Sequence, residues 1–481
     1  MSTLQNVNVS VLPIERFEEV LEPAQWHIVE EDNRVARGLF EGCVIWNVNS
    51  TAVGGGVAEM LQSLLALARG AGIDARWVVI EGEPDFFTLT KRLHHLLHGS
   101  PGDGGPTGDA ERAVYERVTN GNAVALAELV RPGDIVLLHD PQTVGMAATL
   151  RRAGAHVVWR SHIGIDVPND EVRKAWRFLL PYVTEADAFV FTRDSYVPPE
   201  LADRDIVIIP PSIDVFSQKN QEMSEAQVRA ILVATGLVTS ETQAEPWFFH
   251  HNGERDLVRR LSVVDEDEPL DFNDPLVVQV SRWDPLKDPI GVMRGFADRV
   301  VDRVPSARLV LAGPSPEGVT DDPEGAGVLE QVRAARLALP RHVRHRIHVA
   351  SLPMVDRSEN AAIVNALQRH SVVIVQKSLA EGFGLTVAEA MWKRRPVVAG
   401  RVGGIQDQIE DGVSGILLDD PADTDAFGDA VAGILEDPAL AHRMGEAAQK
   451  RVRQQFLGSR HLDQYLALFR RLIEKDVSPR P

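Results

Sequence analysis

The sequence is poor in cysteine, in aromatic residues and in positive charge. Of its 481 residues only Cys43 is a cysteine, aromatic residues make up 6%, and 50 Lys and Arg face 69 Asp and Glu, a net charge of −19. A single cysteine excludes an intrachain disulfide and a zinc site built on cysteines. The acidic excess argues against nucleic acid and anionic membranes as partners, because both repel negative charge.

Long apolar runs are also missing. No run approaches the ~20 apolar residues that a membrane helix needs, and the stretch 1–7 lacks the basic and apolar segments of a signal peptide. We therefore expect a cytoplasmic protein. Hydrophobic residues at 44% and charged residues at 25% are typical of a globular chain, and about 150 residues per domain suggests two or three domains.

Short runs rich in Val and Ile alternate with helical patterns along most of the chain. Most runs are apolar on both faces, which predicts parallel strands covered by helices on each side, in a doubly wound α/β fold. The first series of expected strands is 43–47, 75–80, 134–139, 156–160, 188–192 and 206–209. The second series is 276–281, 307–312, 347–350, 372–376, 396–399 and 415–418.

The segment 218–275 separates the two series. It contains one helical pattern, at 225–235, and ends in the acidic run 265–271, which we expect to be a solvated connection. We therefore predict a first domain over 1–270 and a second over 271–457. A helical pattern over 439–474 is interrupted at Leu457-Gly458, and the part after the break, 458–475, is expected to pack back on the first domain. The stretch 99–108 is rich in Gly and Pro and predicts a flexible loop.

Three segments at strand ends carry chemistry, and the first contains Gly54, Gly55 and Gly56. Because the three glycines have no Cβ atoms, the amides at the start of the following helix can approach a ligand closely. The spacing matches neither the dinucleotide-binding fingerprint nor the P-loop, and a tight strand–helix turn needs glycine in any case.

The second segment places Arg282 and Lys287 after the strand 276–281. Asp288 and Pro289 form a good N-cap and first turn for the next helix. Ligands of open α/β sheets bind at the carboxyl ends of parallel strands, and a guanidinium with an ammonium suits a diphosphate. The alternative is two surface cations that solubilise a turn.

In the third segment, a turn with Glu381 and two glycines leads into a helix that carries Glu389. Carboxylates accept hydrogen bonds from sugar hydroxyls, and free amides at a helix start bind phosphate. By spacing alone, Glu381 could equally be a charge that favours the helix dipole, and Glu389 an exposed helix residue.

Glu381-Gly382-Phe383-Gly384 followed by Glu389 resembles the Glu-x7-Glu motif of retaining GT-B glycosyltransferases of family four, and the pair Arg282 and Lys287 resembles their phosphate-binding pair. The resemblance covers nearly the whole chain. It is most specific for the trehalose glycosyltransferring synthase branch, which the segments 48–61, 139–142, 159–163, 210–214 and 376–378 resemble.

This resemblance implies two Rossmann-like domains facing a central cleft, with the acceptor on the first and the nucleotide sugar on the second. It implies a homodimer and no obligatory cofactor or metal, because Arg, Lys and helix amides replace the charge of a metal ion. Two histidine sets have no accompanying cysteine, so we do not interpret them as metal ligands: they are His94, His95 and His98, and His342, His345 and His348.

Site residues follow from the same resemblance. Arg282 and Lys287 would hold the diphosphate, Glu381 the 3- and 4-hydroxyls of the donor sugar, and Glu389 the ribose. His162 would meet the 6-hydroxyl of the donor glucose, which makes Arg282, Lys287, Glu381 and His162 the expected catalytic set. The remaining donor-side positions are Gly55, Gly56, Gly382, Phe383, Gly384 and Leu385, with Gly403 and Gly404 closing on the donor. The expected acceptor contacts are Asn49, His139, Asp140 and His162.

The expected reaction is transfer of glucose from a nucleoside diphosphate glucose, ADP- or UDP-glucose, to free glucose, giving trehalose with retention and in a reversible manner. Two alternatives stay open: a trehalose phosphorylase that uses inorganic phosphate, and a non-catalytic nucleotide-sugar sensor. The segments 218–275 and 99–108 are longer than expected for archaeal-type members, and the sequence assigns no role to 406–408.

Overall fold

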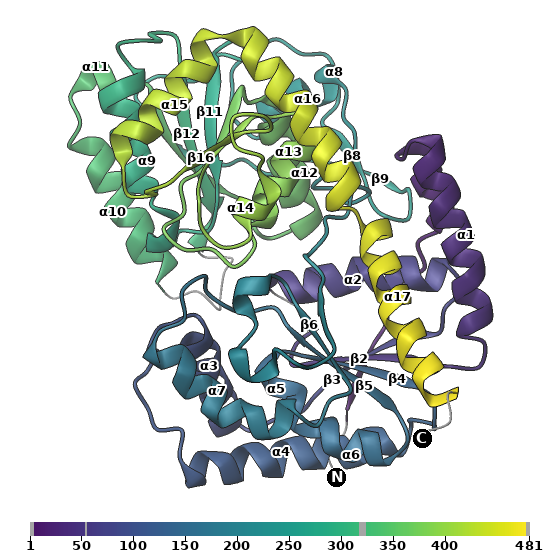
Figure 1. The fold of residues 1–481 in the computed structure, drawn as a ribbon. Helices are drawn as coiled ribbons and strands as arrows, with labels where there is room; N and C mark the ends of the chain where they lie inside the picture. The colour runs from purple at the N-terminus through teal and green to yellow at the C-terminus, as the bar shows by residue number, and fades with distance from the viewer. Residues whose placement is uncertain (1–3, 53–54, 317–323, 478–481) are drawn as a thin grey trace. The chain divides into compact units, whose positions relative to one another are not determined.

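The computed structural model describes residues 4–52, 55–316 and 324–477. The chain forms two compact units (Figure 1). The first comprises Met1–Ser212 together with Phe456–Pro481, and the second comprises Ile213–Gln455. Each unit is built on one seven-stranded sheet.

The sheet of the first unit has the strand order β1-β3-β2-β4-β5-β6-β7. Its strands are β1 (Gln5–Val7), β2 (Ile45–Asn49), β3 (Ala75–Val79), β4 (Ile135–His139), β5 (His156–Ser161), β6 (Ala188–Phe191) and β7 (Ile206–Ile208). All six predicted strands are confirmed and run parallel. The sequence did not indicate β1, a short polar strand that pairs antiparallel with β3 at the sheet edge.

Helices cover both faces of this sheet (Figure 1). One face carries α1 (Pro23–Leu39), α2 (Gly55–Gly70) and α17 (Gly458–Val477), and the other carries α3 (Pro84–Leu97), α4 (Asp109–Ala127), α6 (Ala147–Arg152) and α7 (Asp170–Val183). The second face encloses an aromatic core that includes Tyr115, Trp159 and Phe189. The loop 99–108 between α3 and α4 is held by Arg92, which pairs with Asp103 at 2.5 Å.

The sheet of the second unit has the order β10-β13-β12-β11-β14-β15-β16, with β10 antiparallel at its edge. Its strands are β10 (Val263–Asp265), β11 (Leu276–Val280), β12 (Arg308–Pro314), β13 (Ile347–Leu352), β14 (Val373–Gln376), β15 (Val397–Gly400) and β16 (Ile416–Leu418). The six strands of the predicted second series are confirmed and run parallel.

The second sheet is also covered on both faces. One side carries α9 (Pro289–Gly295), α10 (Gly325–Leu337) and α15 (Thr424–Glu436), and the other α8 (Glu225–Ala234), α12 (Arg357–His370), α13 (Leu385–Trp392) and α16 (Pro438–Gln455). Smaller elements are the helices α5 (Asp140–Thr143), α11 (Arg341–Arg344) and α14 (Ile405–Gln408) and the hairpin β8 (Trp247–Phe249) and β9 (Arg255–Leu257). In the part of the chain that the structure describes, no helix is long and apolar enough to cross a bilayer.

The division of the chain differs from the expected boundary near residue 270. The units divide after Ser212, because α8 packs on α12 and β10 pairs with β13, which attaches 213–270 to the second unit. The expectation that 265–271 is a solvated connection is wrong for two of its acidic residues. Asp265 lies 2.8 Å from Arg333, and Asp267 lies 2.9 Å from both Arg336 and Arg344. These arginines are distant in sequence, so the run by itself gives no sign that it is neutralised.

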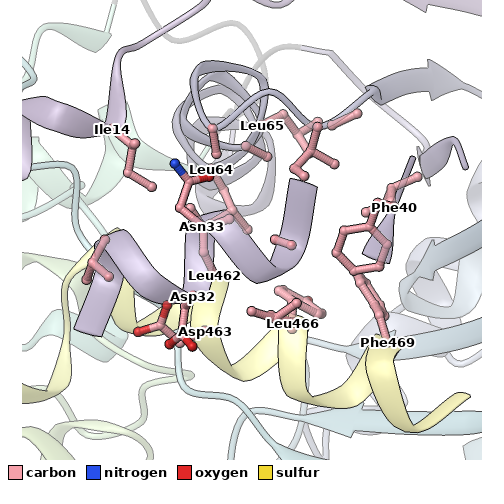
Figure 2. Close-up of a pocket in the computed structure, with 18 of the residues that line it drawn as sticks. Ile14, Asp32, Asn33, Phe40, Leu64, Leu65, Leu462, Asp463, Leu466 and Phe469 are labelled. Carbon is pink, nitrogen blue, oxygen red and sulfur yellow. The ribbon is translucent and has the colours of Figure 1, made fainter. Parts of the chain in front are cut away.

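A mainly apolar cavity of about 80 Å³ lies in the first unit, between α1, α2, α17 and the sheet (Figure 2). Two carboxylates, Asp32 of α1 and Asp463 of α17, lie side by side at one end of it. Asn47 and Tyr465 belong to its lining. The last helix is therefore part of the first unit, and it forms one wall of the space behind the sheet.

Both sheets have a point where the strand order reverses, between β2 and β4 in the first unit and between β11 and β14 in the second. The loops after the two strands at such a point diverge and leave a crevice at the carboxyl edge, where ligands of doubly wound folds bind. The fold therefore fixes one expected binding position in each unit.

Candidate functional site

Four side chains form a hydrogen-bonded chain at the switch point of the first unit. His139, at the end of β4, lies with Nε2 3.1 Å from Asn47 Oδ1 and with Nδ1 3.0 Å from His162 Nε2. Arg160 of β5 donates from Nε to His162 Nδ1 at 3.3 Å. The polar chain thus crosses the three parallel strands β2, β4 and β5. Asn47 and His139 are 92 residues apart in the sequence, and His139 and His162 are 23 apart.

The direction of these hydrogen bonds assigns the tautomers of both rings. Arg160 can only donate, so Nδ1 of His162 accepts, and the hydrogen of that ring is on Nε2. His162 then donates to Nδ1 of His139, which donates from Nε2 to Asn47. Burial, reinforced by the charge of Arg160, lowers the pKa of His139 to about 3 and that of His162 well below its ordinary value. Both rings are therefore neutral at pH 7.

Asp140 and Asn49 flank this chain. Asp140 has a left-handed backbone, with φ of 62°, and its carboxylate accepts a 2.8 Å hydrogen bond from the backbone N–H of His162. Burial raises the pKa of Asp140 to about 7. The Asn49 amide accepts from Trp77 at 2.8 Å and donates to the carbonyl of Thr51 at 2.7 Å. Asn49 thus holds the loop after β2, and a contact to an acceptor would have to replace one of these bonds.

The glycines predicted to meet the donor follow that loop. Gly55 and Gly56 are the first residues of α2, which places their amides at the start of a long helix. Gly54, the first of the three glycines, lies outside the described residues.

At the switch point of the second unit, Lys287 and Glu381 form an ion pair. Their side chains are 14% and 15% exposed, so the pair is largely shielded from water. The backbone N–H of Gly382 also lies 3.2 Å from Glu381 Oε1. Arg282 is different, with a side chain that is 63% exposed and a guanidinium 3.9 Å from Asp284. Two of the predicted donor-binding residues are therefore in contact, and the third lies at the surface of the same loop.

Buried polar side chains hold the loop that carries Lys287 in place by hydrogen bonds and an ion pair. Gln279 donates to the carbonyl of Lys287 at 2.7 Å. Asp288, with a left-handed φ of 47°, accepts from Gly291 N at 3.0 Å and caps α9 as the sequence predicted. Its other carboxylate oxygen pairs with Lys377, whose side chain is fully buried. Lys377 was not among the predicted site residues, because a lysine after a strand does not by itself reveal a buried counter-ion.

Two glycine loops pack backbone against backbone beside Glu381. Gly384 caps α13 with φ of 81°, and Gly403 has φ of 49°. A Cβ on Gly403 would lie 1.7 Å from the carbonyl oxygen of Glu381, so only glycine fits there. Gly404 donates to the carbonyl of Gly382 at 2.9 Å. Phe383 lies in the same turn, and Leu385 begins α13.

Gln408 joins the two loops. It is fully buried, and its side-chain amide lies 2.5 Å from the carbonyl of Phe383 and 3.3 Å from those of Gly384 and Gly404. This explains part of the segment 406–408 that the sequence left without a role. No local pattern could have revealed it, because the three carbonyls come together only in the folded unit.

Glu389 is buried rather than exposed, which contradicts the simplest alternative from sequence. Its residue is 3% exposed, and Oε1 lies 3.5 Å from Lys219 Nζ. Oε2 is buried without a hydrogen-bond partner among the described residues. An unsatisfied buried carboxylate oxygen is unfavourable unless a donor reaches it, and a hydroxyl group is such a donor.

The two switch points therefore offer different chemistry. The first presents neutral rings and a carboxyl group, which suit hydroxyls, and the second presents cations and helix amides, which suit an anion. Over the described ranges, no group of three or more His, Cys, Asp or Glu side chains could hold a metal ion.

Comparison with known proteins identifies this combination. Residues 47–198 match the family model "Trehalose synthase, N-terminal domain", and residues 264–451 match "Glycosyl transferases group 1". A trehalose synthase of Rubrobacter xylanophilus is 35% identical over 444 residues, which cover 91% of this chain and 92% of the relative. The chain belongs to the trehalose synthase family of glycosyltransferases. It is thus a hexosyltransferase, as the Glu-x7-Glu resemblance predicted.

Two more distant similarities are to a trehalose phosphorylase, by sequence, and to a trehalose-phosphate synthase, by structure. A trehalose phosphorylase of Pleurotus pulmonarius is 26% identical over 471 residues, which cover 91% of this chain but 58% of the phosphorylase. The crystal structure of a UDP-forming α,α-trehalose-phosphate synthase from Burkholderia vietnamiensis superposes with a TM-score of 0.64 at 15% identity, covering 89% of this chain and 99% of that one. The structural likeness confirms the predicted GT-B fold of two Rossmann-like domains.

Proposed function

We propose that this member of the trehalose synthase family transfers glucose from a nucleoside diphosphate glucose to free glucose, giving trehalose with retention at the anomeric carbon. The observation that supports it most directly is the shielded pair of Lys287 and Glu381 at the switch point of the second unit. When a nucleotide sugar binds, the lysine of such a pair can bind the phosphate in place of the carboxylate. The carboxylate can then bind the sugar hydroxyls in place of the lysine.

On the donor side, Lys287 would turn from Glu381 to the diphosphate, with Arg282 as the second cation. Glu381 would then accept hydrogen bonds from the sugar hydroxyls, and Oε2 of Glu389 from a ribose hydroxyl. Charge develops on the diphosphate as the bond to the anomeric carbon breaks, and a preorganised donor aimed at such a charge contributes about 3 kcal/mol. The amides from Gly382 to Leu385 would add to this stabilisation at the start of α13.

On the acceptor side, the neutral chain of His139 and His162 would receive glucose hydroxyls together with Asp140. The new bond forms from an acceptor oxygen to the anomeric carbon on the face that the diphosphate leaves, which retains the configuration. The acceptor hydroxyl gives its proton to an oxygen of the departing diphosphate, so no protein carboxylate has to become a covalent nucleophile.

The direct test incubates the protein with glucose and, separately, UDP-, ADP- and GDP-glucose, and identifies the disaccharide and its anomeric linkage by NMR. We expect trehalose and one nucleoside diphosphate from at least one donor. Hydrolysis of the donor without trehalose, or trehalose from none of the three, would contradict the proposal.

The similarity to the Pleurotus phosphorylase supports one competing function, phosphorolysis of trehalose. The reverse reaction separates the two: trehalose is supplied with either a nucleoside diphosphate or inorganic phosphate. A nucleotide sugar formed only with the diphosphate supports the synthase. Glucose 1-phosphate formed only with inorganic phosphate would instead establish a phosphorylase.

A further inference from the structure

Arg160 is a fully buried guanidinium that is surrounded by neutral acceptors. It has no exposed surface, and within the described chain its hydrogen bonds go to His162, His461, Tyr465 and the carbonyl of Ile209. Buried charges in proteins are usually paired with an opposite charge or fully hydrogen-bonded. The protein uses hydrogen bonds here, and they fix the direction of four of the five N–H donors of this side chain.

Two of these acceptors come from the C-terminal helix. His461 Nε2 lies 3.0 Å from an Arg160 NH group, and the Tyr465 hydroxyl accepts from the same group. Nδ1 of His461 lies 2.8 Å from the Ser212 hydroxyl, which assigns the hydrogen of this ring to Nδ1 because Nε2 accepts from Arg160. The helix α17 thus anchors the arginine that reaches the switch point.

The chain Ser212–His461–Arg160–His162–His139–Asn47 is continuous, and Arg160 determines its polarity. Because a guanidinium cannot accept a hydrogen bond, the ring nitrogen on each side of it must be an acceptor. The outer nitrogen of each ring must then be a donor. A neutral residue at this position would remove that constraint and let His162 adopt either tautomer.

We propose that Arg160, anchored by His461 and Tyr465 of α17, is a positioning residue that fixes His162 as a neutral ring with its hydrogen on Nε2. His162 then offers only a donor to the switch point, and it can bind an oxygen but cannot act as a base. That a sugar oxygen replaces His139 as the acceptor of this hydrogen bond depends on the proposed function. The tautomer of His162 does not depend on it.

The charged and titratable groups around His162 agree with this assignment. They are Arg160 of β5, His139 at the end of β4, Asp140 directly after it, and His461 of α17. Arg460 faces His461, and Tyr465 faces Arg160. The charge of Arg160 lowers the pKa of His139, His162 and His461 in addition to burial. Asp140 bonds the backbone N–H of His162 rather than its ring, so it does not impose the other tautomer.

NMR of the ligand-free protein with ¹⁵N-labelled histidine tests the tautomer without any substrate. The His162 signals are assigned by their loss in His162→Gln. We expect the hydrogen on Nε2 in the wild type, with no titration from about pH 8 to about pH 5.5. In Arg160→Met we expect a mixture of tautomers and a midpoint that moves up toward about pH 6. A wild-type hydrogen on Nδ1, or an unchanged signal in Arg160→Met, would overturn the proposal.

Arg336→Met is the control, because Arg336 is also a buried arginine, 3% exposed, but lies in the second unit, where it donates to the carbonyl of Ile347 and pairs with Asp267. It should leave His162 unchanged. If Arg160→Met does not fold, Tyr465→Phe removes one acceptor of Arg160 and keeps the ring. It should shift the His162 titration in the same direction by less, and a His162 signal identical to that of the wild type would then count against the proposal.

Kinetics add a readout that general destabilisation would not produce. Arg160→Met should lower kcat/KM for the donor on the order of 100-fold, and leave the Kd for a nucleoside diphosphate unchanged, since no group of the second unit is altered. An inactive wild type with the expected His162 spectrum would reject the proposed function and leave the positioning role intact. An active wild type whose His162 carries its hydrogen on Nδ1 would do the opposite.

Discussion

The two units use the same topological position for opposite electrostatic purposes. In the first, Asn47 and His139 at the strand-order reversal are neutral and buried, with His139 only 1% exposed. In the second, the corresponding position holds cations paired with carboxylates, and Arg282 is 63% exposed. Burying a neutral group costs less free energy than burying a charge. The completely buried charges near these positions are therefore paired or hydrogen-bonded, Lys377 with Asp288 and Arg160 with four acceptors.

The difference also concerns how each site is prepared before substrates arrive. The histidine chain of the first unit is fully hydrogen-bonded from Arg160 to Asn47, so its donors and acceptors are fixed. In the second unit, Lys287 is bonded to Glu381, and a ligand would have to separate that pair. A fixed polar chain suits hydroxyls of defined direction, and an exchangeable ion pair suits an anion that brings its own charge.

Lys287→Ala should have the largest effect and should act on the second unit alone. We expect kcat/KM to fall by about 10³ and the affinity for a nucleoside diphosphate to drop, because the shielded cation is lost. Steady-state kinetics and calorimetric binding measure the two effects. Lys450→Ala, which removes an exposed lysine of α16, is the control. Near-wild-type turnover of Lys287→Ala would remove the electrostatic contrast between the units.

Gln408→Leu should come next, because it releases the two glycine loops that flank Glu381. Three carbonyls lose a buried donor, which destabilises the fold by about 1–3 kcal/mol. We also expect a 10- to 100-fold rise, by order of magnitude, in the donor KM.

Gln449→Leu is the matched control for this change. Gln449 is another buried glutamine of the second unit, and it donates to the carbonyl of Trp392 at 2.9 Å. It should cause a similar loss of stability with an unchanged donor KM. Equal donor KM values in the two variants would show that Gln408 has no special role at the loops.

Asp463→Asn tests how the stability of the first unit depends on pH. Burial and the neighbouring Asp32 raise the pKa of Asp463 from 3.8 to about 7. The folded state therefore binds a proton that the unfolded chain releases, so stability falls as the pH rises from about 4 to about 7. The neutral Asn removes this loss. We expect a gain of about 1–2 kcal/mol above pH 7 that vanishes near pH 4.

Thermal unfolding at several pH values measures this gain, with the exposed Asp85→Asn as a control. A gain of equal size at pH 4 and pH 8 would point to packing rather than charge. No gain at either pH would mean that the pair at the cavity is solvated.

The smallest expected effect comes from glycine-to-alanine changes, which compare the unfolding of the two units. Gly121 in α4 and Gly433 in α15 have nothing within 4 Å of an added Cβ. Alanine at either position should stabilise its unit by about 0.5–1 kcal/mol. If the units unfold separately, Gly121→Ala and Gly433→Ala will shift different calorimetric transitions. A shift of one common transition by both would show that they unfold together.

Much of the fold could be predicted because parallel strands buried on both faces leave a clear pattern. All six strands of each predicted series form, and Asp288 caps its helix as expected. Edge strands were missed: β1 and β10 have three residues each and pair antiparallel, so neither shows an apolar run. The boundary was misplaced because α8 packs on α12 and β10 pairs with β13, contacts that attach 213–270 to the second unit and that no local pattern shows.

The sequence by itself determined the family, the two α/β domains and the positions of Arg282, Lys287, Glu381 and Glu389, since these depend on local spacing after a strand. Only the tertiary structure decided how those residues are paired. It brought Lys377 to Asp288, Gln408 to three carbonyls and Arg160 to His461. The partners are 89 residues apart for Lys377 and Asp288, at most 25 apart for Gln408 and 301 apart for Arg160 and His461. Hydrogen-bond geometry in three dimensions, not spacing along the chain, selects these contacts.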